Sequence, residues 1–182
     1  MHIILVAAEN DALPHLKVGG LGDVIRDLPI ALSRMGHKET VVTPGNGLFS
    51  EENAELVGLL EPSFMGRPET IEVFNVPTTV SSSNISQLVL DHRLFSIAGA
   101  GRIYTQDSTE GPFATDANRF ALFCVGVCEL LLHEQDEAID VIHCHDWHTG
   151  ALLILREFSK RYQPLRDLLT VYSIHNLSMQ GV

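Results

Sequence analysis

The segment LKVGGLGD (residues 16–23) places Lys17 two residues before a glycine pair and opens an amphipathic run. Glycines let backbone N–H groups approach a ligand closely, and a helix N-terminus adds roughly half a positive charge. Lys17 would add a full charge and several N–H donors. The pattern indicates a site for an anion, with phosphate as first candidate, and equally fits a tight turn with a solvated lysine. It matches neither the dinucleotide fingerprint G-x-G-x-x-G nor the P-loop.

The segment HCHDWH (residues 143–148) gathers four side chains that can bind metals or form hydrogen bonds, namely His143, His145, Asp146 and His148. In a strand, successive side chains point to opposite faces, so these groups do not all converge. A catalytic zinc site needs well-placed ligands with partners behind them. We therefore expect no metal and interpret Asp146, at a strand end, as an acceptor for hydroxyl groups. For Trp147, packing is the favoured role and a platform for a sugar ring is the alternative.

His175 and Asn176 end an otherwise apolar stretch, LLTVYSIHN. A histidine at a strand end is either a structural cap or a member of a site. The chain has no G-x-S-x-G signature that would supply a rival serine nucleophile. Both residues therefore become candidates for substrate binding.

Alternating strand and helix patterns must position these groups. The apolar run at residues 3–8 predicts a parallel strand buried on both faces. Apolar residues from 24 to 35 follow helical spacing and end at Gly36, and residues 39–43 predict a second strand. Pro29 predicts a kink or a late helix start near it. This β-turn-α-β unit is typical of parallel sheets.

The middle of the chain, about 46–112, contains short strand patterns among polar loops, and we interpret it as an inserted β-rich excursion. Asp116 is expected to cap a helix of about 18 residues. Residues 140–146 then predict a strand, 148–161 a helix and 168–176 a strand. The expected fold class is α/β, a doubly wound, mostly parallel, Rossmann-like sheet with helices on both faces. Ligands bind beyond the carboxyl ends of such strands, where all three polar segments fall.

Composition excludes several partners. The 182 residues carry a net charge of −11, with 45% apolar and 19% charged residues, which is globular composition. No Lys/Arg run is present to neutralise phosphates, so we expect neither nucleic acid nor membrane as a partner. The longest apolar stretch, residues 120–132, is too short to span a bilayer, and the first residues lack the basic region of a signal peptide. Three cysteines do not make a disulfide framework, and a cytoplasmic location is expected.

Three motifs in this order, AAEN…LKVGGLGDV, HDWHTGAL and IHNLSMQG, carry a resemblance to a known family. The chain resembles the N-terminal half of bacterial glycogen synthases and plant starch synthases, which belong to glycosyltransferase family 5. Those enzymes carry K-T-G-G-L-[AG]-D-V, H-D-W-H and H-N-L-A-[YF]-Q-G. The segment IYTQDSTEGPFATDANRFALF also looks like theirs, so the resemblance spans essentially the whole chain.

The resemblance implies the N-terminal half of a GT-B fold, in which two Rossmann-like domains face a cleft. It implies a retaining hexosyltransferase that passes glucose from ADP-glucose to the 4-hydroxyl of an α-1,4-glucan, with no metal and no cofactor. Lys17 matches a lysine that contacts the donor, and Gly19 and Gly20 match glycines whose amides approach the diphosphate. His175 matches a histidine close to the transferred glucose, and Asp146 an acidic residue of the sugar pocket. Lys17, Asp146 and His175 are therefore the expected catalytic residues. Further residues expected to bind substrate are Glu9, Asp23 and Asn176.

Some positions depart from the family pattern. The segment NDALPHL, between Glu9 and Lys17, is about two residues longer than usual, Val18 replaces a common threonine, and Ser178-Met179 replaces an alanine and an aromatic residue. We expect residues 1–182 to be an N-terminal fragment that lacks the C-terminal nucleotide-binding domain and is inactive alone. The alternatives are a stand-alone glucan-binding domain or one subunit of a split synthase. A dehydrogenase is remote because G-x-G-x-x-G is missing after the first strand.

Overall fold

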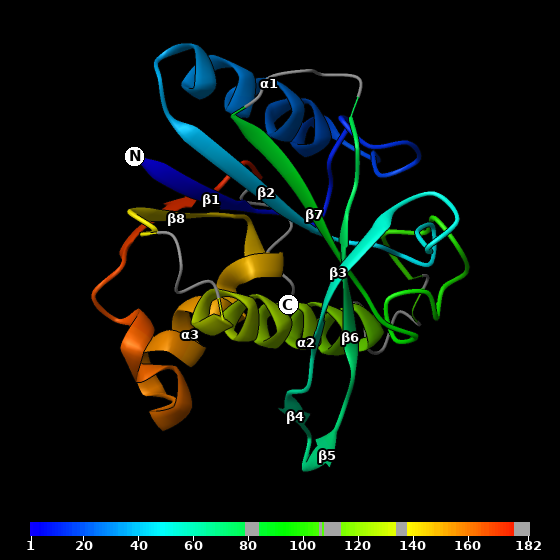
Figure 1. Cartoon of the computed structure of the whole chain (residues 1–182). Coiled ribbons are helices and arrows are strands. Elements are labelled where there is room, and N and C mark those ends of the chain that lie inside the picture. Colours follow the sequence, from blue (N-terminus) through cyan, green and yellow to red (C-terminus); the bar gives the residue numbers. More distant parts are fainter. Residues whose placement is uncertain (79–83, 106, 108–113, 134–137, 177–182) are drawn as a thin grey trace.

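The computed structural model describes residues 1–78, 84–105, 107, 114–133 and 138–176 (Figure 1). A seven-stranded sheet has the order β3-β6-β7-β2-β1-β8-β9. Its parallel part consists of five neighbouring strands: β7 (Ile85–Asp91), β2 (Lys38–Pro44), β1 (His2–Val6), β8 (Val141–His145) and β9 (Leu169–Ser173). The mostly parallel α/β sheet expected from the sequence is therefore confirmed.

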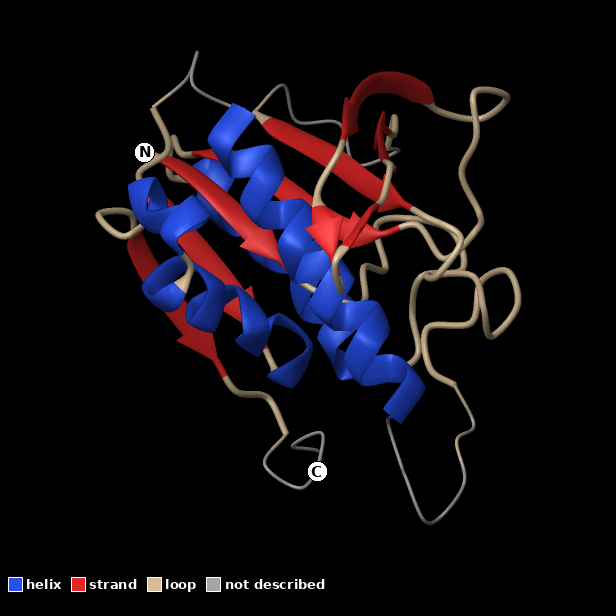
Figure 2. Cartoon of the chain, turned by 90° about the horizontal axis from the view of Figure 1, so that it is seen from below, coloured by secondary structure: helices blue, strands red, loops and turns tan. Residues whose placement is uncertain are grey.

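Helices cover both faces of this sheet, as expected (Figure 1), and Figure 2 shows the helices that cover one of these faces. Helix α1 (Gly20–Arg34) buries Leu21 and Ile25 against Ile3 and Leu5 of β1. The alternate residues of β1 face the other layer, formed by α2 (Ala114–His133) and α3 (Gly150–Phe158). Since successive strand residues point to opposite faces, a strand buried on both sides needs an unbroken apolar run.

The middle of the chain is rich in strands, as predicted, and three of these strands extend the main sheet. Strand β7 pairs in parallel with β2, and β6 (Ile71–Asn75) and β3 (Glu55–Leu60) continue the sheet in antiparallel order. The short hairpin of β4 (Ser63–Phe64) and β5 (Arg67–Pro68) projects from this edge (Figure 1). Leu88 and Leu90 of β7 are buried against the layer of α2 and α3, and Val89 is buried on the other face against Leu13 and Leu16, which explains why β7 belongs to the sheet.

Two local features differ from the predictions. Of the kink or late helix start predicted near Pro29, the late start is wrong, because α1 begins at Gly20 and continues through Pro29. Asp116 lies inside the first turn of α2 and does not cap it, because its carboxylate accepts the N–H of Thr105 at 3.1 Å and pairs with Arg119 at 2.7 Å. These partners hold the preceding segment, which carries Tyr104, against the helix.

The predicted helix at 148–161 is divided into three short pieces. A 3-10 turn, η1 (Trp147–Thr149), leads into α3, and η2 (Lys160–Leu165) follows it. The division falls at Ser159, whose backbone is extended. Strand β8 ends just before η1 begins. The η1 turn thus places Trp147 and His148 at the carboxyl edge of the sheet.

Candidate active site

A cavity of 360 Å³ lies at the carboxyl edge of the sheet, where β1, β8 and β9 end. Of the eight predicted site residues, six line it: Glu9, Gly19, Gly20, Asp146, His175 and Asn176. Its other lining residues are Leu21, Tyr104, Trp147 and His148. Lys17 and Asp23 lie outside the lining. A larger cavity of 660 Å³ near the β4–β5 hairpin contains none of the predicted residues.

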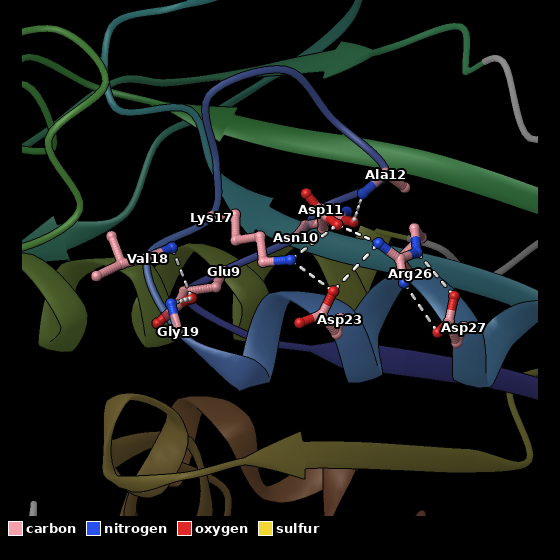
Figure 3. A network of polar contacts seen from close by, with 10 residues as sticks. All are labelled: Glu9, Asn10, Asp11, Ala12, Lys17, Val18, Gly19, Asp23, Arg26 and Asp27. Atoms are coloured by element: carbon pink, nitrogen blue, oxygen red, sulfur yellow. Dashed lines mark hydrogen bonds and ion pairs between the residues drawn. The ribbon is translucent and has the colours of Figure 1, made fainter.

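Glu9 is the organising side chain at the end of β1. It is 4% exposed, and its Oε2 accepts the backbone N–H groups of Val18 at 2.9 Å and Gly19 at 2.7 Å (Figure 3). Its Oε1 accepts the hydroxyl proton of Tyr104 at 2.9 Å. The Gly19 amide therefore donates to Glu9, which closes the glycine turn from inside the protein.

Helix α1 begins at the cavity. The N-cap residue Gly19 is extended, no described side chain forms a cap hydrogen bond at this terminus, and Gly20 and Leu21 of the first turn line the cavity. The first N–H groups of a helix have no partner within it, and the helix dipole places positive potential there. This terminus is the part of the glycine turn that can receive an anion.

Lys17 belongs to an ion-pair network on the outer side of the turn (Figure 3). Its Nζ lies 2.5 Å from Asp23 Oδ1 and 3.2 Å from Asp11 Oδ2, and Arg26 contacts both of these carboxylates. The hydrogen bond to Asp23, and then that to Asp11, raises the pKa of Lys17. The lysine charge is thus compensated within the network, and the sequence did not indicate Asp11 or Arg26 as its neighbours.

The loop that carries Asp11 is held by Asn10, which is fully buried. The Asn10 side-chain amide donates to Gln87 Oε1 at 2.7 Å, and its Oδ1 accepts the N–H of Ala12 at 3.0 Å. The backbone N–H of Asn10 donates to the carbonyl of Leu16 at 2.7 Å. Because Asn10 holds both ends of this loop, it fixes the position from which Asp11 contacts Lys17.

Asp146 joins the ends of β8 and β9. It has a φ of 57°, which is rare for a residue with a side chain and costs on the order of 1–3 kcal/mol. Its N–H donates to the carbonyl of Ser173 at 2.9 Å, and its Oδ1 accepts the backbone N–H of His175 at 2.7 Å. Strained residues that the surroundings hold in place are concentrated at functional sites.

The His175 ring lies at the mouth of the cavity, against a histidine of β8. Its Nε2 is 2.9 Å from His145 Nδ1, and the two rings are nearly parallel, with centroids 5.2 Å apart. His145 is fully buried, and burial lowers its pKa to about 3. The expectation that 143 and 145 share one face of β8 is confirmed, because the rings of His143 and His145 stack 4.1 Å apart.

The sequence did not indicate Tyr104 as a site residue, and His148 was considered only as a possible ligand of the metal that we did not expect. The Tyr104 oxygen is 3.0 Å from His148 Nε2, and burial lowers the pKa of His148 to about 4. The Tyr104 hydroxyl donates its hydrogen bond to Glu9, so its oxygen can act only as an acceptor toward His148. The neutral His148 therefore donates a hydrogen bond from Nε2–H to the Tyr104 oxygen. Tyr104 was quoted only within the family-like segment, whose irregular backbone gave no signal for its position.

The packing role predicted for Trp147 is confirmed, and the residue also lies at the cavity. Its ring packs edge-on against Phe120, with centroids 5.4 Å apart, and it also lines the cavity. Such a site offers acidic acceptors, neutral imidazoles, an aromatic face and a helix N-terminus, which together suit a ligand with hydroxyl groups and an anionic part. In the described ranges, no group of three or more His, Cys, Asp or Glu side chains is arranged to hold a metal ion.

No helix within the described ranges is long and apolar enough to cross a membrane. The predicted departure at Ser178-Met179 lies outside the described residues.

Comparisons with known proteins agree with this arrangement. A glycogen synthase from Hydrogenobaculum sp. is 29% identical over 100% of this chain and 35% of that protein. A glycogen synthase from Gloeobacter violaceus is 33% identical over 100% of this chain and 34% of that protein. The catalytic domain of starch synthase IV from Arabidopsis thaliana, bound to ADP and acarbose, has a TM-score of 0.77 at 26% identity. That match covers 99% of this chain and 35% of that chain.

The chain therefore spans about a third of the length of the relatives it matches, and it corresponds to their N-terminal part. The structural match confirms the expected GT-B half. The family model for the starch synthase catalytic domain matches residues 2–182. The chain belongs to the starch synthase catalytic domain family, which comprises glycogen and starch synthases.

Proposed function

We propose that this chain forms the N-terminal wall of a glucan synthase active site. The reaction would transfer glucose from ADP-glucose to the non-reducing end of an α-1,4-glucan, with retention of configuration. The observation that carries the proposal is the meeting of three distant segments at one cavity, through Glu9, Asp146 and His175. The ADP bound by starch synthase IV supports an adenine nucleotide as part of the donor.

The start of α1 is the proposed site of the diphosphate. The departing diphosphate gains negative charge as the glycosidic bond breaks, so amides fixed at Gly20 and Leu21 would stabilise the transition state more than the ground state. Lys17 could assist only by exchanging Asp23 or Asp11 for a phosphate oxygen. We therefore propose that Lys17 joins the donor site when the diphosphate is present.

The strand ends are the proposed site of the sugar. Asp146 uses Oδ1 to hold the His175 backbone, and its Oδ2 can accept a hydrogen bond from a sugar hydroxyl. The Trp147 ring offers an apolar face to a sugar ring. Groups held near the anomeric carbon can orient a sugar that becomes oxocarbenium-like in the transition state. Asn176, beside His175, is proposed as a further hydrogen-bonding residue of this pocket.

The other wall of the donor site is proposed to come from the part of the relatives that lies outside the matched third. Residues 1–182 alone would then bind ADP-glucose weakly and would not turn it over. We also propose a cytoplasmic location.

Titration of the ¹⁵N-labelled chain with ADP-glucose tests this proposal. Binding at the cavity should shift the amide resonances of Gly20, Leu21 and His175, whereas glucose alone should affect mainly the strand ends. An assay with ADP-glucose and maltohexaose should show no transfer by the chain alone. Absence of shifts at millimolar ADP-glucose, or shifts confined to the β4–β5 hairpin, would contradict the assignment.

A glucan-binding role without catalysis is the second candidate. It is favoured by the position of Trp147, whose ring lines a cavity that this chain builds by itself. Calorimetry with maltohexaose distinguishes the two, because this role requires glucan binding that ADP neither competes with nor enhances.

A further inference from the structure

His145 is the last residue of β8 and has no part in the cavity lining, although it contacts a residue that does. It is fully buried, and its ring lies between two other histidine rings, those of His143 and His175. His143 Nε2 is itself 2.8 Å from Ser173 Oγ, so the outer ring is fixed as well. The stack leaves the His145 ring little freedom to turn.

The two nitrogens of His145 have different surroundings. Nδ1 lies 2.9 Å from His175 Nε2, whereas Nε2 is buried without a hydrogen-bond partner among the described residues. Burial, reinforced by His143 and His175, keeps the pKa of His145 near 3, so the ring is neutral at neutral pH. A neutral imidazole carries one N–H, and its position follows from the hydrogen bonds of the ring.

Two proton arrangements can satisfy the bond between His145 and His175. If His175 donated from Nε2, the His145 proton would have to sit on its own Nε2, as a buried N–H without an acceptor. Such groups are rare in folded proteins. If His145 donates from Nδ1, only an unprotonated ring nitrogen is left without a partner. The second arrangement is favoured because it leaves no buried donor unsatisfied.

We propose that His145 is a positioning residue that holds neutral His175 in the Nδ1-protonated form. Nε2 of His175 is then occupied as an acceptor, and Nδ1–H is the ring group that a ligand in the cavity can reach. His175 would donate a hydrogen bond to a hydroxyl, carbonyl or phosphate oxygen and would not act there as a base. This consequence rests on the proposed function, but the protonation state itself does not.

Long-range ¹H–¹⁵N NMR of the ¹⁵N-labelled 182-residue chain at pH 8 reads the protonated nitrogen of each histidine directly. We expect Nδ1–H for His145 and His175. His92 is an internal reference of the opposite kind, because its Nδ1 accepts the N–H of Leu94 at 3.1 Å and its Nε2 faces Glu69 at 3.1 Å. A wild-type spectrum with Nε2–H at His175 would overturn the proposal.

Two substitutions test whether His145 is the cause. In His145→Asn, the side-chain amide nitrogen lies near the position of Nδ1 and can donate in the same way, so His175 should keep Nδ1–H. In His145→Leu, His175 should change to the Nε2–H form that free neutral histidine prefers. His133→Leu, at the exposed end of α2, is the matched control and should change nothing at His175.

Retention of Nδ1–H in a folded His145→Leu chain would show that His145 does not set the proton position. Circular dichroism establishes folding of each variant, and the wild-type and asparagine spectra decide the matter if the leucine variant does not fold. No ligand is used, so failure of ADP-glucose to bind would contradict the proposed function and leave this inference intact.

Discussion

The carboxylate of Glu9 accepts the hydroxyl proton of Tyr104 at 2.9 Å, although the two residues are 95 positions apart. The same carboxylate holds the glycine turn through the N–H groups of Val18 and Gly19. His148 extends the chain of hydrogen bonds to η1. One buried side chain therefore connects the start of α1, the Tyr104 segment and the end of β8, so the shape of the cavity depends on it.

Replacement of Glu9 by glutamine should loosen the glycine turn. If the glutamine side-chain oxygen accepts the hydrogen bond from Tyr104, the glutamine NH₂ group faces the two backbone N–H groups of the turn. These two N–H groups then lose their acceptor. We expect a loss of about 2 kcal/mol in the free energy of unfolding and faster hydrogen exchange at Val18 and Gly19. Urea unfolding and amide exchange measure these effects.

The matched control is Tyr104→Phe, which removes the hydrogen bonds to Glu9 and His148 and leaves the Glu9 contacts to the turn in place. It should cost about 1 kcal/mol and leave exchange at the turn unchanged. If Glu9→Gln also left the exchange rates of Val18 and Gly19 unchanged, Glu9 would not hold the turn.

Removal of Asp23 should strengthen binding of ADP. The Asp23→Asn substitution releases Lys17 from its nearest carboxylate and removes a negative charge beside the cavity. We expect the Kd for ADP, measured by calorimetry at low salt, to fall by roughly threefold to tenfold, whereas Lys17→Met should raise it. Asp27→Asn, on the same helix and in contact with Arg26, is the control. Equal weakening by Asp23→Asn and Lys17→Met would instead mean that Asp23 orients the lysine for binding.

The sheet could be predicted from the sequence where local pattern and burial agree. The run at residues 3–8 is apolar throughout because β1 is covered on both faces. The similar run in β7 was assigned only to an inserted β-rich excursion, because its pairing with β2 is a long-range contact that polar loops on either side obscure. Topology also explains why Asp146 and His175 could be predicted as site residues from the sequence, since both follow parallel strands.

The partners of the site residues could not be predicted in the same way. The position of Lys17 depends on Asp11, and so on the conformation of the loop anchored by Asn10. Tyr104 reaches Glu9 because Asp116 and Arg119 bind the backbone of its segment. These contacts arise from tertiary packing of irregular segments, for which residue spacing gives no periodic signal.

Replacement of Arg119 by methionine should destabilise the chain strongly. Arg119 is 1% exposed, and its guanidinium pairs with Asp116 at 2.7 Å and donates to the carbonyls of Ile103 and Phe95. Its removal leaves a buried carboxylate and unsatisfied carbonyls, and should cost about 3–5 kcal/mol. Thermal and urea unfolding measure the loss. Arg102→Met, a change of the same type at an exposed residue, should cost less than about 0.5 kcal/mol; similar losses for both variants would contradict the assigned role.

Glu39 of β2 should make the chain less stable as pH rises toward neutrality. Its side chain is fully buried, neither carboxylate oxygen has a hydrogen-bond partner among the described residues, and burial raises its pKa from 4.5 to about 7. Below pH 4.5 both folded and unfolded forms bind the proton, so there is no penalty. Between 4.5 and 7 only the folded form keeps it, and the free energy of unfolding falls with pH, by on the order of 3 kcal/mol in total.

Glu39→Gln removes the titrating proton and should abolish this decline, so the variant gains stability relative to wild type as pH rises from 4.5 to 7. Urea unfolding at half-unit steps of pH gives the difference directly. Glu55→Gln, on the exposed edge strand β3, is the matched control and should follow the wild-type curve. A constant difference between wild type and Glu39→Gln across this range would mean that the folded protein ionises Glu39 as readily as the unfolded chain does. In that case Glu39 would need a partner for its charge within the folded chain.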